Sequence, residues 1–206
     1  MISRLIVAVG LAATLLATGC VGVNTFRTYY ETPVSAEVSR NWRVVDVNVT
    51  APRTLTVSEA HTILPNADIV WQEDPPGDRY KQIEDLIRTA ALQGAKAARG
   101  SQPVRLEITV VRFHALTFQA ESLRADVGVH NVDFTIRAVD ARTGAVLAGP
   151  ELIEAALPAM TGARMAEARA RGQSQRTQIS AHLRKVVAGW MGVGPDARET
   201  FTRVGN

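Results

Sequence analysis

The chain has 206 residues, of which 46% are hydrophobic and 21% are charged, and its formal net charge is +3. This length suits one globular domain, and the hydrophobic fraction is sufficient for a core. The near balance of charge, without a run of basic residues, excludes a nucleic-acid-binding surface of the usual basic kind. Because the chain has a single cysteine, its core and not a set of disulfide bonds must hold the fold together.

The N-terminus has the pattern of a secretory signal peptide. Arg4 precedes an apolar run over residues 5–16, which is shorter than the roughly 20 residues that a membrane-spanning helix needs. The small residues 17–19 then lead into Cys20. The order Leu-Ala-Thr-Gly-Cys over residues 16–20 resembles the lipobox of bacterial lipoproteins. This resemblance implies that the thiol is diacylglycerylated, that the signal peptide is removed, and that the new amino group is acylated.

We therefore expect residues 1–19 to be a signal peptide and Cys20 to be the site of lipidation. Two or three acyl chains anchor a protein stably, at about 0.8 kcal/mol per buried methylene. The alternatives are a cleaved signal peptide followed by an incidental cysteine, and a cysteine that is buried in the core. Val21 follows the cysteine, whereas an Asp there often retains lipoproteins of this kind at the inner membrane. The resemblance thus implies an outer-membrane anchor, with palmitate among the acyl chains and the body of the protein in the periplasm.

The rest of the chain divides into three predicted parts. Residues 20–40 are expected to be a lipidated tether, residues 41–192 a periplasmic domain, and residues 193–206 a flexible C-terminal tail. Alternating apolar residues predict strands over 42–49, 104–118, 127–139 and 145–153, with short strands within 54–64 and at 67–71.

Two helices are predicted by apolar residues at helical spacing. The first begins after Asp78, a plausible N-cap, and ends before Gly100, and the second covers residues 173–191. The predicted fold class is α+β, with a single antiparallel-rich sheet, a β-α-β-β-β-α order and two helices packed on one face. Val45, Leu106 and Phe134 are expected among the side chains that the helices bury.

Three stretches resemble a family of uncharacterised alphaproteobacterial lipoproteins. They are WQEDPPGDRY over residues 71–80, RFHALT over residues 112–117 and VGVHNVDF over residues 127–134. The resemblance implies a location and brings no activity, substrate or catalytic residue. The element order is also similar to small periplasmic α/β lipoprotein domains that assist envelope transport or assembly, but this likeness is one of fold alone.

His114 and His130 are the candidates for a metal site. If the strands around them form a hairpin centred near Ser122, the two histidines face each other directly. With Asp126 or Glu121 nearby, they would begin a metal site. The alternative is a pair of structural histidines, which we favour because a metal site normally needs three or four ligands.

Enzymatic motifs are missing from the sequence. There is no nucleophile elbow, phosphate-binding loop, dinucleotide fingerprint or zinc spacing. Three pairs of carboxylates are expected to be solvated, and they are Glu73 with Asp74, Glu84 with Asp85, and Glu151 with Glu154. A solvated helix face, or contact with anionic lipid headgroups, is expected for the basic residues Arg164, Arg169, Arg171, Arg176, Arg184 and Lys185.

These observations predict a membrane-anchored periplasmic lipoprotein that is not an enzyme and needs no cofactor. Its expected role is to bind a protein partner in cell-envelope assembly or transport. It is not expected to bind nucleic acid. One alternative is a small-ligand-binding or lipid-binding lipoprotein, which would need an apolar cavity. The other is a metal-binding protein that uses His114 and His130.

Overall fold

The computed structural model describes residues 25–124 and 128–202. The predicted signal peptide and Cys20 therefore lie outside the described residues. Within the described ranges the chain forms nine strands, five α-helices and one short 3-10 helix. The strands are β1 (Thr25–Tyr29), β2 (Trp42–Thr50), β3 (Val57–Ser58), β4 (Ile69–Val70), β5 (Gln102–His114), β6 (Gly128–Asp140), β7 (Val146–Ala155), β8 (Leu157–Ala159) and β9 (Glu199–Thr202). The helices are α1 (Ala36–Ser39), α2 (Arg79–Gly94), η1 (Ala95–Ala97), α3 (Phe118–Glu121), α4 (Gly162–Ala170) and α5 (Gln175–Trp190).

The strands form one mixed sheet in the order β3-β4-β5-β6-β7-β1-β9. Strand β2 pairs with β5, and β8 pairs with β6. The predicted antiparallel meander is present as β5, β6 and β7. The prediction of an antiparallel-rich sheet is wrong, because β2 and β4 both run parallel to β5 and β3 runs parallel to β4. For β2 and β4 the reason is the crossover through α2, since a strand that returns to the sheet by way of a helix joins it in parallel.

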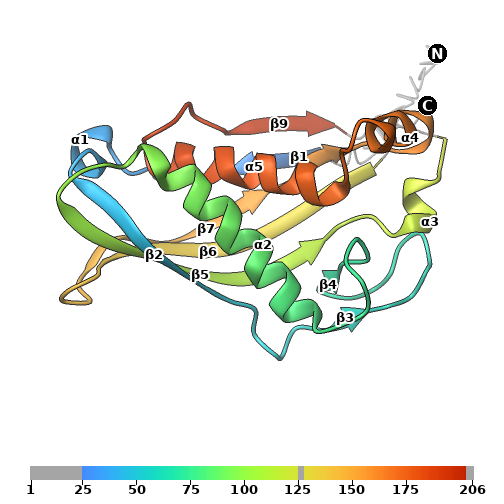
Figure 1. Ribbon diagram of the computed structural model, residues 1–206, viewed down its shortest axis with the longest axis horizontal. Helices are drawn as coiled ribbons and strands as arrows, with labels where there is room; N and C mark the ends of the chain where they lie inside the picture. Colours follow the sequence, from blue (N-terminus) through green and yellow to red (C-terminus); the bar gives the residue numbers. More distant parts are fainter. Residues whose placement is uncertain (1–24, 125–127, 203–206) are drawn as a thin grey trace, which may run out of the picture.

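Helices α2 and α5 lie side by side over one face of the sheet, as expected (Figure 1). Helix α2 starts where the sequence predicts, because the Asp78 side chain accepts a hydrogen bond of 3.2 Å from the Lys81 amide. Helix α2 ends at Gly94, earlier than predicted, and η1 follows it. A Cβ atom on Gly94 would lie 2.5 Å from the Arg184 carbonyl oxygen, so the two helix backbones touch at this glycine.

The core lies between these helices and the sheet. Val47, Leu106 and Phe134 are fully buried there. The prediction that Val45 belongs to this core is wrong, because Val45 is 50% exposed. A β-bulge separates Val44 from Asp46 in the pairing with β5, and it turns Val45 out of the alternation.

Both ends of the described chain belong to the sheet. Strand β1, in the segment expected to be a tether, pairs with β7 and β9. Strand β9, in the segment expected to be a flexible tail, stacks Phe201 on Phe26 with ring centroids 6.0 Å apart. Tyr30 is fully buried. Neither strand is predicted from the sequence, because strands this short give little periodicity.

No helix in the described ranges is long and apolar enough to cross a bilayer.

Candidate functional site

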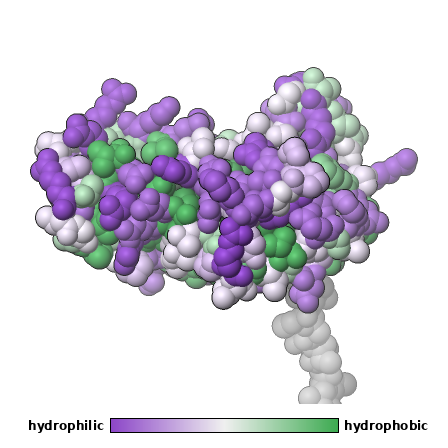
Figure 2. Space-filling view, turned by 60° about the horizontal axis from the view of Figure 1, so that its bottom comes forward, coloured by the Kyte–Doolittle hydropathy of each residue, from purple (hydrophilic) through white to green (hydrophobic). Residues whose placement is uncertain are grey.

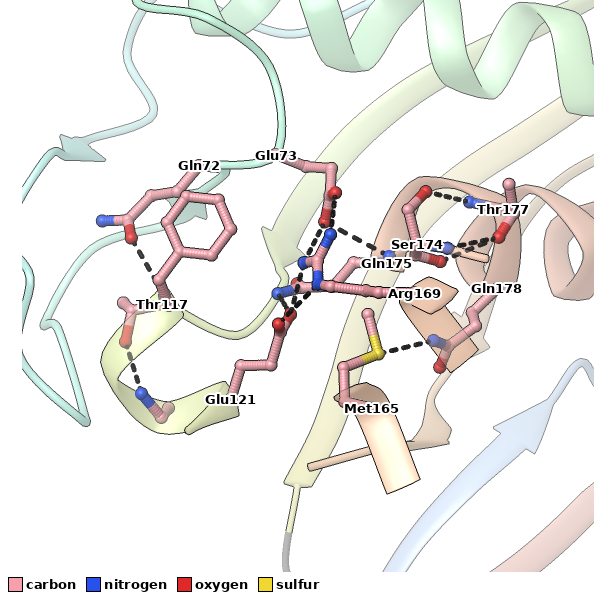
Figure 3. A network of polar contacts seen from close by, with 12 residues as sticks. Gln72, Glu73, Thr117, Glu121, Met165, Arg169, Ser174, Gln175, Thr177 and Gln178 are labelled. Carbon is pink, nitrogen blue, oxygen red and sulfur yellow. Dashed lines mark hydrogen bonds and ion pairs between the residues drawn. The ribbon is translucent and has the colours of Figure 1, made fainter. Parts of the chain in front are cut away.

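A network of polar contacts joins α3, α4, the start of α5 and the loop between β4 and α2 (Figure 3). Arg169 of α4 is at its centre. The guanidinium donates to both carboxylate oxygens of Glu121 at 2.8 and 2.7 Å, and to both oxygens of Glu73 at 2.9 and 3.1 Å. Both carboxylate side chains are only 11% exposed. Arg169 therefore fastens two acidic side chains that come from separate parts of the chain.

Gln175 also binds both carboxylates, and we call Arg169, Glu73, Glu121 and Gln175 together the clamp. Gln175 donates to Glu73 from its backbone amide at 3.2 Å and to Glu121 from its side chain at 2.6 Å. The hydrogen bonds to Glu121 and Glu73 raise the pKa of Arg169, so the guanidinium stays charged. Because each carboxylate is held by a cation and by further donors, the clamp provides no free acid–base pair. It is suited to holding the fold together.

The three carboxylate pairs expected to be solvated all have partners. In the first pair, Glu73 belongs to the clamp, and Asp74 accepts from the Trp71 indole at 2.7 Å. In the second pair, Glu84 accepts from the Ala51 amide at 2.8 Å, and Asp85 binds Lys81 at 3.0 Å. In the third pair, Glu151 accepts from the Trp190 indole at 2.9 Å, and Glu154 binds Arg27. These contacts tie loops, helices and strands together.

His114 and His130 do not face each other. In the first part of the β5–β6 ladder Val110 pairs with Phe134, and this register, if continued, would place His114 opposite His130. A bulge at Val111 shifts the register by one residue, and His114 pairs with Asn131 instead. A one-residue slip moves the partner to the opposite face of the sheet. His114 donates from Nε2 to the carbonyl of Ala67.

His130 is fully buried, and neither ring nitrogen has a hydrogen-bond partner within the part of the chain that the structure describes. Burial lowers the pKa of His130 to about 3, with a smaller contribution from the charge of His182. Burial also lowers the pKa of His182 to about 4, assisted by Lys185. Among residues 25–124 and 128–202, no group of three or more His, Cys, Asp or Glu side chains is placed to hold a metal ion. Of the two further candidate ligands, Asp126 lies outside these residues and Glu121 is bound by Arg169.

The face of the sheet opposite α2 and α5 carries rows of side chains across neighbouring strands. One row runs through Thr50, Thr109, Thr135 and Leu152, each paired with the next. We call this surface the open face, and it consists of this row together with Arg105, Glu107 and Arg137. The open face bears a depression of about 440 Å³.

The charges of the open face are paired within it. Glu107 accepts from Arg137 at 2.7 Å and from Arg105 at 3.1 Å, and these contacts lower its pKa. Leu152, in contrast, is 50% exposed. The open face therefore combines one carboxylate held by two guanidinium groups, hydroxyl groups and one large apolar side chain. Such a mixture is found at protein–protein interfaces.

A second hollow, of about 590 Å³, lies between α2, α5 and the segment that follows α5. Ala97, Ala188 and Val193 form part of its apolar lining, and Lys96, Arg184 and Lys185 also contact it. We call it the helix groove. Hydrophobic side chains elsewhere gather in separate patches between hydrophilic ones (Figure 2).

The basic residues expected on one helix face are divided among these features. Arg169 belongs to the clamp, Arg176 binds Asp74, and Arg171 lies 3.9 Å from Glu167. Arg184 and Lys185 border the helix groove. Arg164 lines another hollow beside α5. Lys96 was not among the basic residues predicted to act together. It lies in η1, after α2, and only the fold brings it to the helix groove.

Comparison with solved structures gives weak likenesses. Two PelC dodecamers from Paraburkholderia phytofirmans are each 12% identical to this chain, with TM-scores of 0.35 and 0.33. The matches cover 81% and 80% of this chain, and 95% and 94% of theirs. A Caulobacter crescentus protein described as a "putative lipoprotein" is 17% identical, with a TM-score of 0.29, over 52% of this chain and 82% of that one. Similarity this low carries no argument about function.

A search of curated proteins finds no match. The match to a family is extensive, because residues 42–206 fit the family described as a family of unknown function (DUF6778). This stretch begins at the first residue of β2 and includes α2, the meander and α5. The chain belongs to this family of unknown function, DUF6778.

Proposed function

We propose that this protein is a lipoprotein of the cell envelope that is not an enzyme and that binds a protein partner through its open face. In this proposal Cys20 carries the acyl chains, the anchor is in the outer membrane, and the domain is in the periplasm. The partner belongs to an assembly or transport system of the envelope. The observation that supports partner binding is the open face itself, a sheet surface that neither α2 nor α5 covers.

The composition of the open face favours a protein over a small cationic ligand. A site for a cation needs a free carboxylate, whereas Glu107 is already bound by Arg105 and Arg137. The row from Thr50 to Leu152 instead offers hydroxyl groups and an apolar side chain to a complementary surface. The carboxylates of the clamp are held in the same way, which argues against acid–base catalysis there.

The experiment is affinity capture of the full-length acylated protein from membranes of its native cells. A Thr109→Arg variant places a long cation in the middle of the open face, and a Thr89→Arg variant places the same group on the exposed surface of α2. We expect a stoichiometric envelope partner that the Thr89→Arg variant retains and the Thr109→Arg variant loses. Equal retention by both variants would contradict the proposal for the open face.

A Cys20→Ala variant separates the anchor from the surface. If acylation holds the protein at the membrane, this variant leaves the membrane fraction. Wild-type protein without an acyl modification on Cys20, measured by intact mass, would contradict the proposed anchor whatever the open face binds.

The helix groove supports a second candidate function, the binding of an anionic lipid or fatty acid. Its apolar lining suits an acyl chain, and Lys96, Arg184 and Lys185 suit a negative headgroup. Native mass spectrometry of purified protein would detect such a ligand. We expect Ala188→Leu, which adds volume inside the groove, to reduce its occupancy. If neither the wild-type protein nor the Ala188→Leu variant carries a bound lipid or fatty acid, this second function is wrong.

A further inference from the structure

The end of the domain that follows the anchor carries an apolar surface. Strand β1 begins at Thr25, at the same end of the molecule as α3 and α4 (Figure 1). A hollow of about 180 Å³ adjoins this point. We call its larger apolar side chains the tether-end patch, which consists of Phe26, Ile63, Leu64, Leu116, Leu123 and Val129.

The patch contains the most exposed large hydrophobic side chain of the described residues, Leu64, which is 78% exposed, and Ile63 beside it is 42% exposed. The other four side chains of the patch are half-buried. A single exposed apolar side chain is ordinary, but two neighbouring ones beside half-buried apolar side chains around one hollow indicate a contact surface.

The loop that presents Leu64 is held in place by hydrogen bonds. The side chain of Gln72 donates to the Ala60 carbonyl at 3.1 Å, and the hydroxyl of Thr117 donates to the Thr62 carbonyl at 2.9 Å. His114 binds the carbonyl of Ala67 on the other side of the loop. The fold thus fixes both flanks of the loop while the Leu64 side chain faces solvent.

The length of chain between the anchor and the fold limits what this patch can meet. Thr25 lies five residues after Cys20, and five extended residues span at most about 18 Å. Phe26 of the patch is the next residue. An acyl chain on Cys20 therefore keeps the tether-end patch within a short distance of the bilayer surface, where the headgroup layer is itself several Å thick.

We propose that the tether-end patch lies against the bilayer that holds Cys20, with Leu64 and Ile63 inserted at the level of the headgroups. This inference rests on the proposed acylation of Cys20. Apolar side chains at the interface add to the binding supplied by the acyl chains. Arg124, which is exposed next to Leu123, is suited to contact the phosphates of anionic lipids. The open face and the helix groove then have a fixed orientation relative to the membrane.

The test uses the full-length acylated protein in vesicles of phosphatidylethanolamine and phosphatidylglycerol. Because the chain has no cysteine besides Cys20, a Leu64→Cys variant provides one thiol for an environment-sensitive fluorophore. The control is Arg142→Cys, in the turn between β6 and β7 at the opposite end of the molecule (Figure 1). Spin-labelled lipids in the same vesicles quench a fluorophore that reaches the bilayer.

We expect the label at position 64 to emit at shorter wavelength and to be quenched at least twofold more than the label at position 142. Equal quenching of the two labels would overturn the inference. A label at position 64 that is shifted in wavelength but not quenched would also overturn it, because a protein or a second copy of this chain would then cover the patch. Dye uptake by wild-type Cys20 would instead show that the proposed acylation is wrong.

Discussion

The hydroxyl of Tyr30 donates a hydrogen bond of 2.8 Å to the carboxylate of Asp196, and it links the segment after β1 to the segment before β9. The same hydroxyl accepts from the Ala197 amide at 3.0 Å. Burial, followed by the contact with Asp196, raises the pKa of Tyr30 to about 12. Two segments that are far apart in sequence thus hold each other in place.

We predict that Tyr30→Phe lowers the free energy of unfolding by about 1–2 kcal/mol. The ring remains buried, while Asp196 loses a donor and the Ala197 amide loses its acceptor. Urea unfolding followed by tryptophan fluorescence measures the change. Tyr29→Phe is the matched control, because Tyr29 is 37% exposed, and it should stay within about 0.5 kcal/mol of wild type. Equal effects of the two variants would contradict this role for Tyr30.

Arg169→Met should lower the free energy of unfolding by about 2–3 kcal/mol. It leaves Glu73 and Glu121 close together without a cation, and removal of one partner from a buried ion pair costs roughly 3–5 kcal/mol. We expect less here because the Arg169 side chain is 34% exposed. Thermal and urea unfolding would both register the loss.

The control for Arg169 is Arg171→Met, at the C-cap of the same helix. Arg171 lies 3.9 Å from Glu167, and these side chains are 63% and 71% exposed. Exposed pairs contribute about 0–1 kcal/mol, so this variant should unfold near the wild-type midpoint. If the clamp stabilises the fold, Arg169→Met must have a clearly lower free energy of unfolding than Arg171→Met. Equal values for the two variants would contradict this role.

Gly94→Ala should destabilise the protein by about 1–3 kcal/mol, although alanine is ordinarily the better helix former by about 0.5–1 kcal/mol. The new methyl group would lie 2.5 Å from the Arg184 carbonyl oxygen, and α2 and α5 would have to separate. Gly77→Ala meets only the flexible Gln82 amide, at 3.1 Å, and serves as the control. We expect the unfolding temperature of Gly94→Ala, measured by calorimetry, to lie clearly below that of Gly77→Ala.

Acid should destabilise the fold through His130. In the unfolded chain this histidine binds a proton near pH 6.5, whereas in the folded protein it stays neutral down to about pH 3. The unfolded state therefore binds more protons in that window, and stability falls as the pH falls through it. The loss from one such histidine is about 1.4 kcal/mol between pH 7 and pH 5.5.

A His130→Leu variant tests this prediction. It removes the titrating group and also replaces two ring nitrogens that lack hydrogen-bond partners among the described residues. We expect stability at pH 7.5 close to that of wild type and a flatter decline to pH 5.5, measured by urea titrations at several pH values. The remaining slope belongs largely to His182, whose pKa is about 4. Parallel curves for the two proteins would show that His130 does not contribute.

Sequence reasoning succeeded where a local signal was strong. The N-cap of α2 was recognised because Asp78 follows a proline-rich loop and precedes residues at helical spacing. The meander was recognised because its strands contain ten to thirteen residues, which is long enough for alternation to be clear.

Sequence reasoning failed where the outcome depended on one residue or on distant partners. The bulges at Val45 and Val111 each reverse the face of the residues that follow, and no pattern in the sequence marks them. The second bulge separated His114 from His130. The clamp brings Arg169 to Glu73 across 96 residues of chain, a pairing that only the packing of α4 against the loop creates. The helix groove and the open face likewise arise from tertiary structure.

The position of β1 between β7 and β9 has a consequence for the order of assembly. Strand β9 consists of residues 199–202, so the sheet can be completed only after residue 202 has been synthesised and, if the chain is exported unfolded, has crossed the inner membrane. Until then β1 has a free edge on its outer side, and a free edge is a site for pairing with other chains. The acyl anchor proposed on Cys20, five residues before β1, would hold this open edge at the membrane surface during that interval.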